Sequence, residues 1–165
     1  MKVRAKICGI TSFEDANQAV EAGADALGFV FYQNSPRYIS PEQAANICKK
    51  LPPFVCKVGL FVDASRKEIN QICQAVELDL LQFHGAEQEE DCVGFSLPYI
   101  KAIKVQNSKD LESAENEYPS AKAILVDTFK QGVPGGTGER FDWTLLPEQR
   151  LKPLILAGGL NEKNI

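Results

Sequence analysis

Histidine, methionine and tryptophan are nearly absent from this sequence, which has one of each among its 165 residues. The five cysteines form no C-x-x-C pair, so the spacing of a zinc site or a thioredoxin-like redox site is missing. No apolar run reaches the length of about 20 residues that a membrane-spanning helix needs. The net charge of -4 offers nothing to attract nucleic acid or an anionic membrane. These absences argue against a metal site and against nucleic-acid or membrane partners.

The composition that remains is that of an ordinary globular chain, with 44% hydrophobic and 24% charged residues. The length predicts a single domain over residues 1–165. The chain opens on a strand-like run rather than a signal peptide, and its cysteines are odd in number and widely spaced, which favours free thiols in a reducing compartment. We therefore expect a cytoplasmic protein.

Strand-like and helix-like segments alternate along the chain. Serine residues precede several apolar-periodic stretches and predict helix N-termini at Ser12, at Ser40 with Pro41, at Ser65 with Glu68, and at Ser108. Gly23 is expected to end the first helix, and Asn161 to cap a last one. Between these helices, apolar strands are predicted at residues 3–8, 26–31, 55–62, 80–83, 99–105, 123–126 and 154–157.

Strands that are apolar on both faces and alternate with helices predict a parallel sheet covered by helices. The two candidate folds are a (βα)8 barrel and an open, doubly wound sheet. Polar pairs follow four of the strands, and only a closed barrel brings the ends of so many strands to one mouth. We therefore predict a (βα)8 TIM barrel, of which this chain contains the part up to the seventh strand. The four pairs are Cys8-Gly9, His84-Gly85, Asp127-Thr128 and Gly158-Gly159.

A thiol and a carboxyl group on one rim are a possible base and acid. A free thiol has a pKa of about 8.5 and a free aspartic acid about 3.9, so a site that uses them must shift both toward neutrality. The alternative for Cys8 is a buried strand cysteine, and for Asp127 a cap on the following turn. His84 either lines the pocket or is structural, and the acidic residues 87–91 are interpreted as a solvated first turn of a helix.

Several loops carry candidate binding residues. Arg37 is either a solvated loop charge or a contact to an anionic substrate group. The glycine-rich run 132–138 is either a connector or a lid that closes over a ligand and excludes water. Gly158 and Gly159 either form a helix-packing turn or let backbone N–H groups approach a phosphate.

Taken together, these motifs resemble the phosphoribosylanthranilate isomerase family, a (βα)8 barrel family of tryptophan biosynthesis. The resemblance spans the whole chain in the family's order, and it ends before the family's eighth βα unit. The matching runs are 6–11 (KICGIT), 28–31 (GFVF), 35–39 (SPRYI), 58–62 (VGLFV), 82–85 (QFHG), 126–128 (VDT), 135–138 (GGTG), 141–143 (FDW) and 156–160 (LAGGL).

The resemblance implies a cofactor-free Amadori rearrangement of N-(5-phosphoribosyl)anthranilate, with Cys8 as the base and Asp127 as the acid. It also implies a small phosphorylated substrate and a monomer or homodimer. The substrate-binding residues that it implies are Arg37, Gln82, His84, Gly136, Gly158 and Gly159.

Three other interpretations stay open. A non-catalytic sugar-phosphate-binding barrel would not need Cys8 and Asp127 together. A structural βα fragment would take its eighth unit from a partner chain. An aminoaldose isomerase of histidine biosynthesis uses two aspartates as acid and base, which the thiol of Cys8 disfavours.

Overall fold

The computed structural model describes residues 3–105, 108–128, 151–158 and 160. It falls into two compact units, which we treat separately. The first unit comprises Met1–Glu87 with Gly94–Pro98, and the second comprises Gln88–Val93 with Tyr99–Ile165. Within the described residues, no helix is long and apolar enough to cross a membrane.

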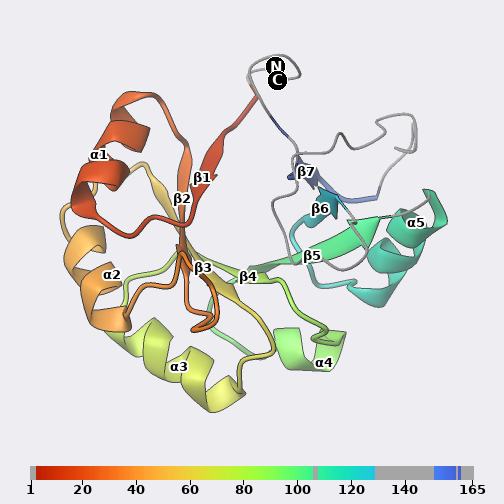
Figure 1. Cartoon of the computed structure of the whole chain (residues 1–165). Coiled ribbons are helices and arrows are strands. Elements are labelled where there is room, and N and C mark those ends of the chain that lie inside the picture. Colours follow the sequence, from red (N-terminus) through yellow and green to blue (C-terminus); the bar gives the residue numbers. More distant parts are fainter. Residues whose placement is uncertain (1–2, 106–107, 129–150, 159, 161–165) are drawn as a thin grey trace. The chain divides into compact units, whose positions relative to one another are not determined.

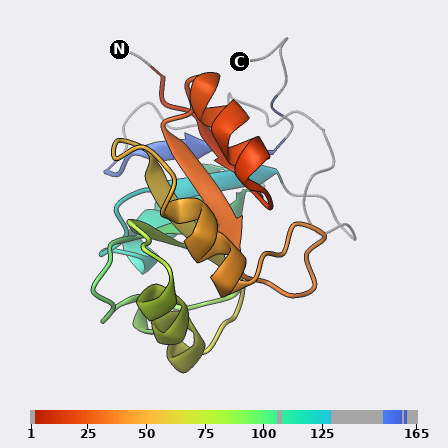
Figure 2. The same cartoon turned by 90° about the vertical axis from the view of Figure 1, so that its left-hand side faces the viewer.

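The first unit is a parallel sheet of four strands, hydrogen-bonded in the order β1-β2-β3-β4, with a helix after each of the first three strands. Helices α1, α2 and α3 lie on one side of the strands (Figure 1), and Figure 2 shows the three helices in front of the sheet. The elements are β1 (Lys6–Cys8), α1 (Phe13–Glu21), β2 (Ala26–Val30), α2 (Pro41–Cys48), β3 (Cys56–Phe61), α3 (Arg66–Ala75) and β4 (Leu80–Phe83).

Serine caps begin all three helices of this unit, as the sequence predicts. The hydroxyl groups of Ser12, Ser40 and Ser65 each accept a hydrogen bond from the backbone N–H three residues later, at 3.1 to 3.2 Å. At the other end of α1, Gly23 has a φ of +93°, a left-handed conformation that glycine adopts without strain. The local sequence therefore determines where these helices begin and where α1 ends.

The sheet of the first unit has two different faces. We call the face that carries Cys8, Gly28 and Gln82 the inner face, because the register of the strands places these residues on the same side. The alternate residues form the outer face, which the helices cover. There Phe61 is fully buried, and its ring lies 5.5 Å from that of Phe31 and 6.4 Å from that of Phe83, centroid to centroid.

A hydrogen bond across the inner face shows that this sheet curls. The Lys6 ammonium group on β1 donates to the amide oxygen of Gln82 on β4. In a flat sheet these strands would lie about 14 Å apart, since neighbouring strands are about 4.8 Å apart, and the two side chains would run parallel. The two side chains meet only because the sheet bends toward its inner face.

The second unit contains α4 (Glu89–Cys92), β5 (Tyr99–Val105), α5 (Ser108–Glu117), β6 (Ile124–Thr128) and β7 (Leu154–Leu156). Its strands are parallel, and β6 pairs with both β5 and β7. The carboxylate of Glu115 on α5 accepts hydrogen bonds from the backbone N–H groups of Leu151 and Lys152, at 3.2 and 3.0 Å. Glu115 thereby ties the start of β7 to α5.

The predicted strands agree with the structure, with differences at their ends. β4 and β5 have the predicted bounds, whereas β1 begins only at Lys6, because the N–H of Ala5 donates to the Asp25 carboxylate instead of to a strand. β6 extends to Thr128, because β5 is long enough to pair with it as far as Val105. The helix predicted after Asn161 lies outside the described residues.

Candidate active site

Cys8 ends β1, where it is half-buried on the inner face and pairs with Gly28 of β2. A Cβ atom on Gly28 would lie 2.8 Å from the thiol sulfur of Cys8 and 3.2 Å from its Cα. Any larger residue at position 28 would collide with the Cys8 side chain, so glycine is required there. The sequence analysis did not name Gly28 as a site residue, although a glycine inside an apolar strand is itself a sign of close approach.

Arg37 lies against the backbone that follows Cys8. Gly9 has a φ of +92°, and a Cβ atom on it would collide with the aliphatic stem of Arg37. The guanidinium Nη1 lies 3.5 Å from the carbonyl oxygen of Cys8, which is a long hydrogen bond. Arg37 is exposed, and its N–H donates to the Ser35 hydroxyl at 3.1 Å. The loop thus presents a cation beside the thiol strand.

Gln82 and His84 form a polar chain on β4 and directly after it. Gln82 is 1% exposed, and its Nε2 lies 2.9 Å from Nδ1 of His84. Its other amide atom, the oxygen, accepts from Lys6. Lys6 is a residue that the sequence analysis left out of the site; its position two residues before Cys8, on the same face of a strand, was the available signal.

Two carboxylates fix the loops after β3 and β4. Glu87 accepts from the N–H groups of Asp63 and Gly85, at 2.8 and 2.9 Å, and Asp63 accepts from the N–H of Ala86 at 2.7 Å. Glu87 is 5% exposed, so its interpretation as part of a solvated acidic turn is wrong. Its carboxylate is buried because it satisfies backbone N–H groups of both loops.

The remaining predicted site residues belong to the second unit or lie outside the described residues. Asp127 is half-buried within β6, where it pairs with Lys104 of β5, so it lies in the strand rather than just after it. Gly158 follows β7 with a φ of +75°. Gly136, Gly159 and the whole glycine-rich run 132–138 lie outside the described residues.

All five cysteines lie in the described part of the chain and are free thiols. Burial raises the pKa of the Cys48 thiol from its ordinary value of 9.0 to about 11, and it also raises the pKa of Cys56 and of Cys73. These three side chains therefore keep their protons at neutral pH. In the described residues, no group of three or more His, Cys, Asp or Glu side chains is arranged to hold a metal ion.

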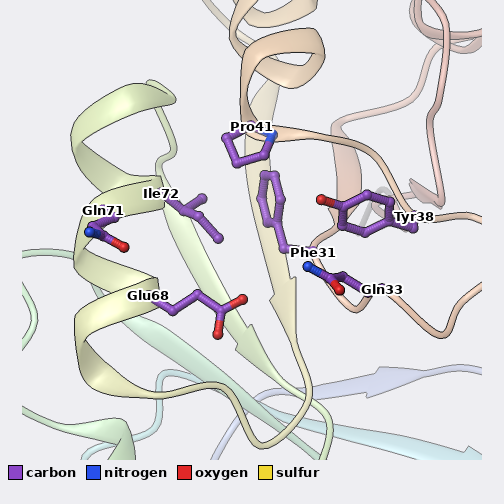
Figure 3. A pocket seen from close by; sticks show the side chains of 7 residues that line it. All are labelled: Phe31, Gln33, Tyr38, Pro41, Glu68, Gln71 and Ile72. Carbon is purple, nitrogen blue, oxygen red and sulfur yellow. The ribbon is translucent and has the colours of Figure 1, made fainter.

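A hollow of about 560 Å³ lies between β1 and α1, and Cys8, Gly9 and Asp15 are among its lining residues. A second cavity, of about 330 Å³, lies on the helix-covered side of the sheet (Figure 3). Glu68 and Ile72 of α3 line one side of it, and Phe31 and Tyr38 line the other. None of the predicted site residues lines this second cavity, so it is separate from the thiol and the polar chain.

Comparison with known proteins identifies relatives of this chain. A family profile for N-(5'-phosphoribosyl)anthranilate isomerase matches residues 5–165. The isomerase of that name from Pseudomonas fluorescens (strain Pf0-1) is 58% identical over 163 residues, which cover 99% of this chain and 80% of the relative. A protein of the same name from Pseudomonas putida (strain W619) is 59% identical, with 99% of this chain and 79% of the relative covered.

Solved structures give the same result. The phosphoribosylanthranilate isomerase of Thermotoga maritima superposes with a TM-score of 0.89 at 47% identity, over 99% of this chain and 80% of the other. An isomerase of the same name, solved with reduced 1-(o-carboxyphenylamino)-1-deoxyribulose 5-phosphate, superposes with a TM-score of 0.80 at 42% identity, over 99% of this chain and 79% of the other. The predicted fold class, a (βα)8 barrel carried as far as its seventh strand, is confirmed over the part that this chain spans.

Proposed function

Because the chain belongs to the N-(5'-phosphoribosyl)anthranilate isomerase family, we propose that Cys8 and Asp127 are the base and the acid of an Amadori rearrangement. The activity is that of the family: an isomerase of tryptophan biosynthesis that converts N-(5'-phosphoribosyl)anthranilate into 1-(o-carboxyphenylamino)-1-deoxyribulose 5-phosphate. The family match over nearly the whole chain is the observation that carries this conclusion.

The first step opens the ribose ring. The carboxylic acid of Asp127 donates its proton to the ring oxygen while the bond between this oxygen and C1 breaks, and the anilinic nitrogen supplies the electron pair that forms the C1–N iminium. The acid must hold its proton at neutral pH for this step. Asp127 is half-buried on β6, where it pairs with Lys104 of β5.

The second step moves a proton from carbon. The Cys8 thiolate takes the proton from C2, and the C–H electron pair forms the C1–C2 double bond as the iminium returns to an amine. The enol then becomes the C2 ketone by losing the proton of its C2 hydroxyl group and gaining a proton at C1. The reaction moves protons within one molecule and consumes no oxidant, so it needs no redox cofactor.

Five glycines and one arginine serve this site. Gly28 gives the thiol room, and Gly9 lets the Arg37 stem pass beside the thiol strand. Arg37 binds an anionic group of the substrate, a role that suits a planar, always charged guanidinium group. Gly158 and Gly159 bind the phosphate through backbone N–H groups, and Gly136 binds the substrate.

The binding partner is therefore a small phosphorylated molecule. A related isomerase, 42% identical, was solved with the reduced form of the phosphorylated product bound. Another relative, 40% identical, is described as monomers generated from a dimeric isomerase. We accordingly propose a monomer or a homodimer for this protein, without a nucleic-acid or membrane partner.

Steady-state kinetics with N-(5'-phosphoribosyl)anthranilate test the two roles. Cys8→Ser and Asp127→Asn should each lower kcat at least about a thousandfold, because each removes one proton-transfer group. Cys73→Ser, which changes a thiol on the helix side of the first unit, is the matched control and should keep kcat near normal. Retained turnover in either site variant, with unchanged thermal melting, would remove that residue from the mechanism.

A further inference from the structure

The polar chain of Lys6, Gln82 and His84 links a cation on β1 to the single histidine of the protein. From its geometry we infer that Lys6 is a positioning residue: it orients the Gln82 amide, and the amide holds His84 as the neutral tautomer with its proton on Nε2. His84 then acts as a hydrogen-bond donor to an oxygen atom of the substrate. Only this last role rests on the proposed function.

The first step is the orientation of the Gln82 amide. A lysine ammonium group has three donors and no acceptor, so the Gln82 atom that faces it must be the oxygen. Gln82 is 1% exposed, and in such a place a reversed amide would set its NH₂ group against the ammonium group without water to separate them. The lysine therefore decides which way the amide points.

The second step is the tautomer of the ring. With its oxygen on Lys6, the amide turns its NH₂ group toward Nδ1 of His84, 2.9 Å away. An NH₂ group donates, so Nδ1 must accept, and a neutral ring that accepts at Nδ1 carries its proton on Nε2.

The third step is that the backbone at His84 is fixed. Its backbone N–H donates to the carbonyl oxygen of Phe61 at 2.9 Å, which fixes the start of the loop after β4. Glu87 holds the next residue, because its carboxylate accepts from the N–H of Gly85. The tautomer is therefore set by a fixed partner beside a fixed backbone, and the ring is prepared as a donor before any substrate arrives.

The single histidine makes a direct test possible. Protein labelled with ¹⁵N-histidine gives one imidazole, and long-range proton–nitrogen correlation in mildly alkaline buffer shows which ring nitrogen carries the proton. The wild-type protein should give the Nε2–H pattern. An Nδ1–H pattern would overturn the inference without reference to activity.

Three variants test the Lys6–Gln82 and Gln82–His84 hydrogen bonds separately. Lys6→Met keeps the length of the side chain and removes its charge, so the amide is released and the Nδ1–H form should appear; Lys6→Arg should restore the Nε2–H pattern. Gln82→Glu presents an acceptor to the ring and should invert the tautomer to Nδ1–H. A Lys6→Met spectrum identical to the wild-type spectrum would show that Lys6 does not orient the amide.

Kinetics test the role toward substrate. Lys6→Met should raise KM about tenfold, the effect of losing one hydrogen bond to an anionic oxygen, and Lys6→Arg should return KM toward normal. An unchanged KM in a Lys6→Met protein whose tautomer has changed would contradict the donor role. A wild-type protein without isomerase activity would contradict the proposed function, while the spectra would still decide the tautomer.

Discussion

The inner and outer faces of β1–β4 are built from neighbouring residues of the same strands and do different work. On the outer face, beneath the helices, Phe61 stacks on Phe31 and lies tilted against Phe83. On the inner face, Lys6 and Gln82 pair with each other, and the sulfur of Cys8 lies where Gly28 leaves it room. The outer face holds the sheet together, whereas the inner face places groups that donate, accept or bind.

The contrast teaches how to judge a buried polar residue in a parallel sheet. Strands covered on both sides are expected to be apolar throughout, so an amide that is 1% exposed costs free energy unless its hydrogen bonds are made. Gln82 makes both, to Lys6 and to His84. A satisfied polar group of this kind, on the face that also carries the thiol, is what we expect of the face that carries the proposed site.

The largest expected effect is loss of an outer-face ring. Phe61→Ala should lower the free energy of unfolding by about 3 to 5 kcal/mol, because it leaves a cavity between two other rings. The matched control is Phe54→Ala: Phe54 is 96% exposed, and its loss should change stability by less than about 0.5 kcal/mol. Urea unfolding followed by circular dichroism measures both. Equal effects would show that the outer face does not hold the sheet.

The next largest effect is expected from a glycine substitution on the inner face, which should lower activity, whereas one on the outer face should lower only stability. Gly28→Ala should lower kcat/KM about a hundredfold, which corresponds to about 2.7 kcal/mol, because the new methyl group displaces the Cys8 thiol. Gly59→Ala is the matched control on the outer face, where the methyl group would meet Leu78 at 2.6 Å. That variant should melt earlier and keep its turnover. If Gly59→Ala lost turnover as Gly28→Ala does, the division between the faces would fail.

The smallest effect depends on pH. The folded protein holds the Cys48 proton more tightly than the unfolded chain does, because burial raises the pKa of this thiol from 9.0 to about 11. The stability that this adds is complete below pH 9 and is lost as the pH rises toward 11. Between pH 9 and pH 11, the free energy of unfolding of Cys48→Ala should fall by about 2 kcal/mol less than that of the wild-type protein. Urea unfolding at several pH values in this range measures the difference. If the unfolding free energy of both proteins fell equally with pH, the raised pKa of Cys48 would be contradicted.

Much of the fold could be predicted because its signals are local. Serine caps lie within three residues of the N–H groups that they bind, and the apolar runs of β4 and β5 end where the strands end. The burial of Glu87 could not be predicted in this way. Its partner in the loop after β3, Asp63, is 24 residues earlier in the chain, and nothing local distinguishes Glu87 from the exposed Glu90 and Asp91.

The candidate site divides in the same manner. Cys8, Arg37, Gln82, His84 and Asp127 stood out by their motifs and by their places at strand ends or in a loop after a strand. Gly28 and Lys6 did not, because a glycine and a lysine are common residues whose meaning here comes from what they touch. The roles of all these site residues remain predictions, and Gly136 and Gly159 lie outside the described residues.

The sequence by itself determined the alternation of strands and helices, the starts of the helices in the first unit and the family. These properties depend on periodicity, caps and motifs that act over a few residues. Only the tertiary structure decided that Lys6 meets Gln82, 76 residues away, and that Gly28 lies against Cys8. The physical reason is curvature: the inner face brings distant strands within reach of a hydrogen bond only once the sheet has curled.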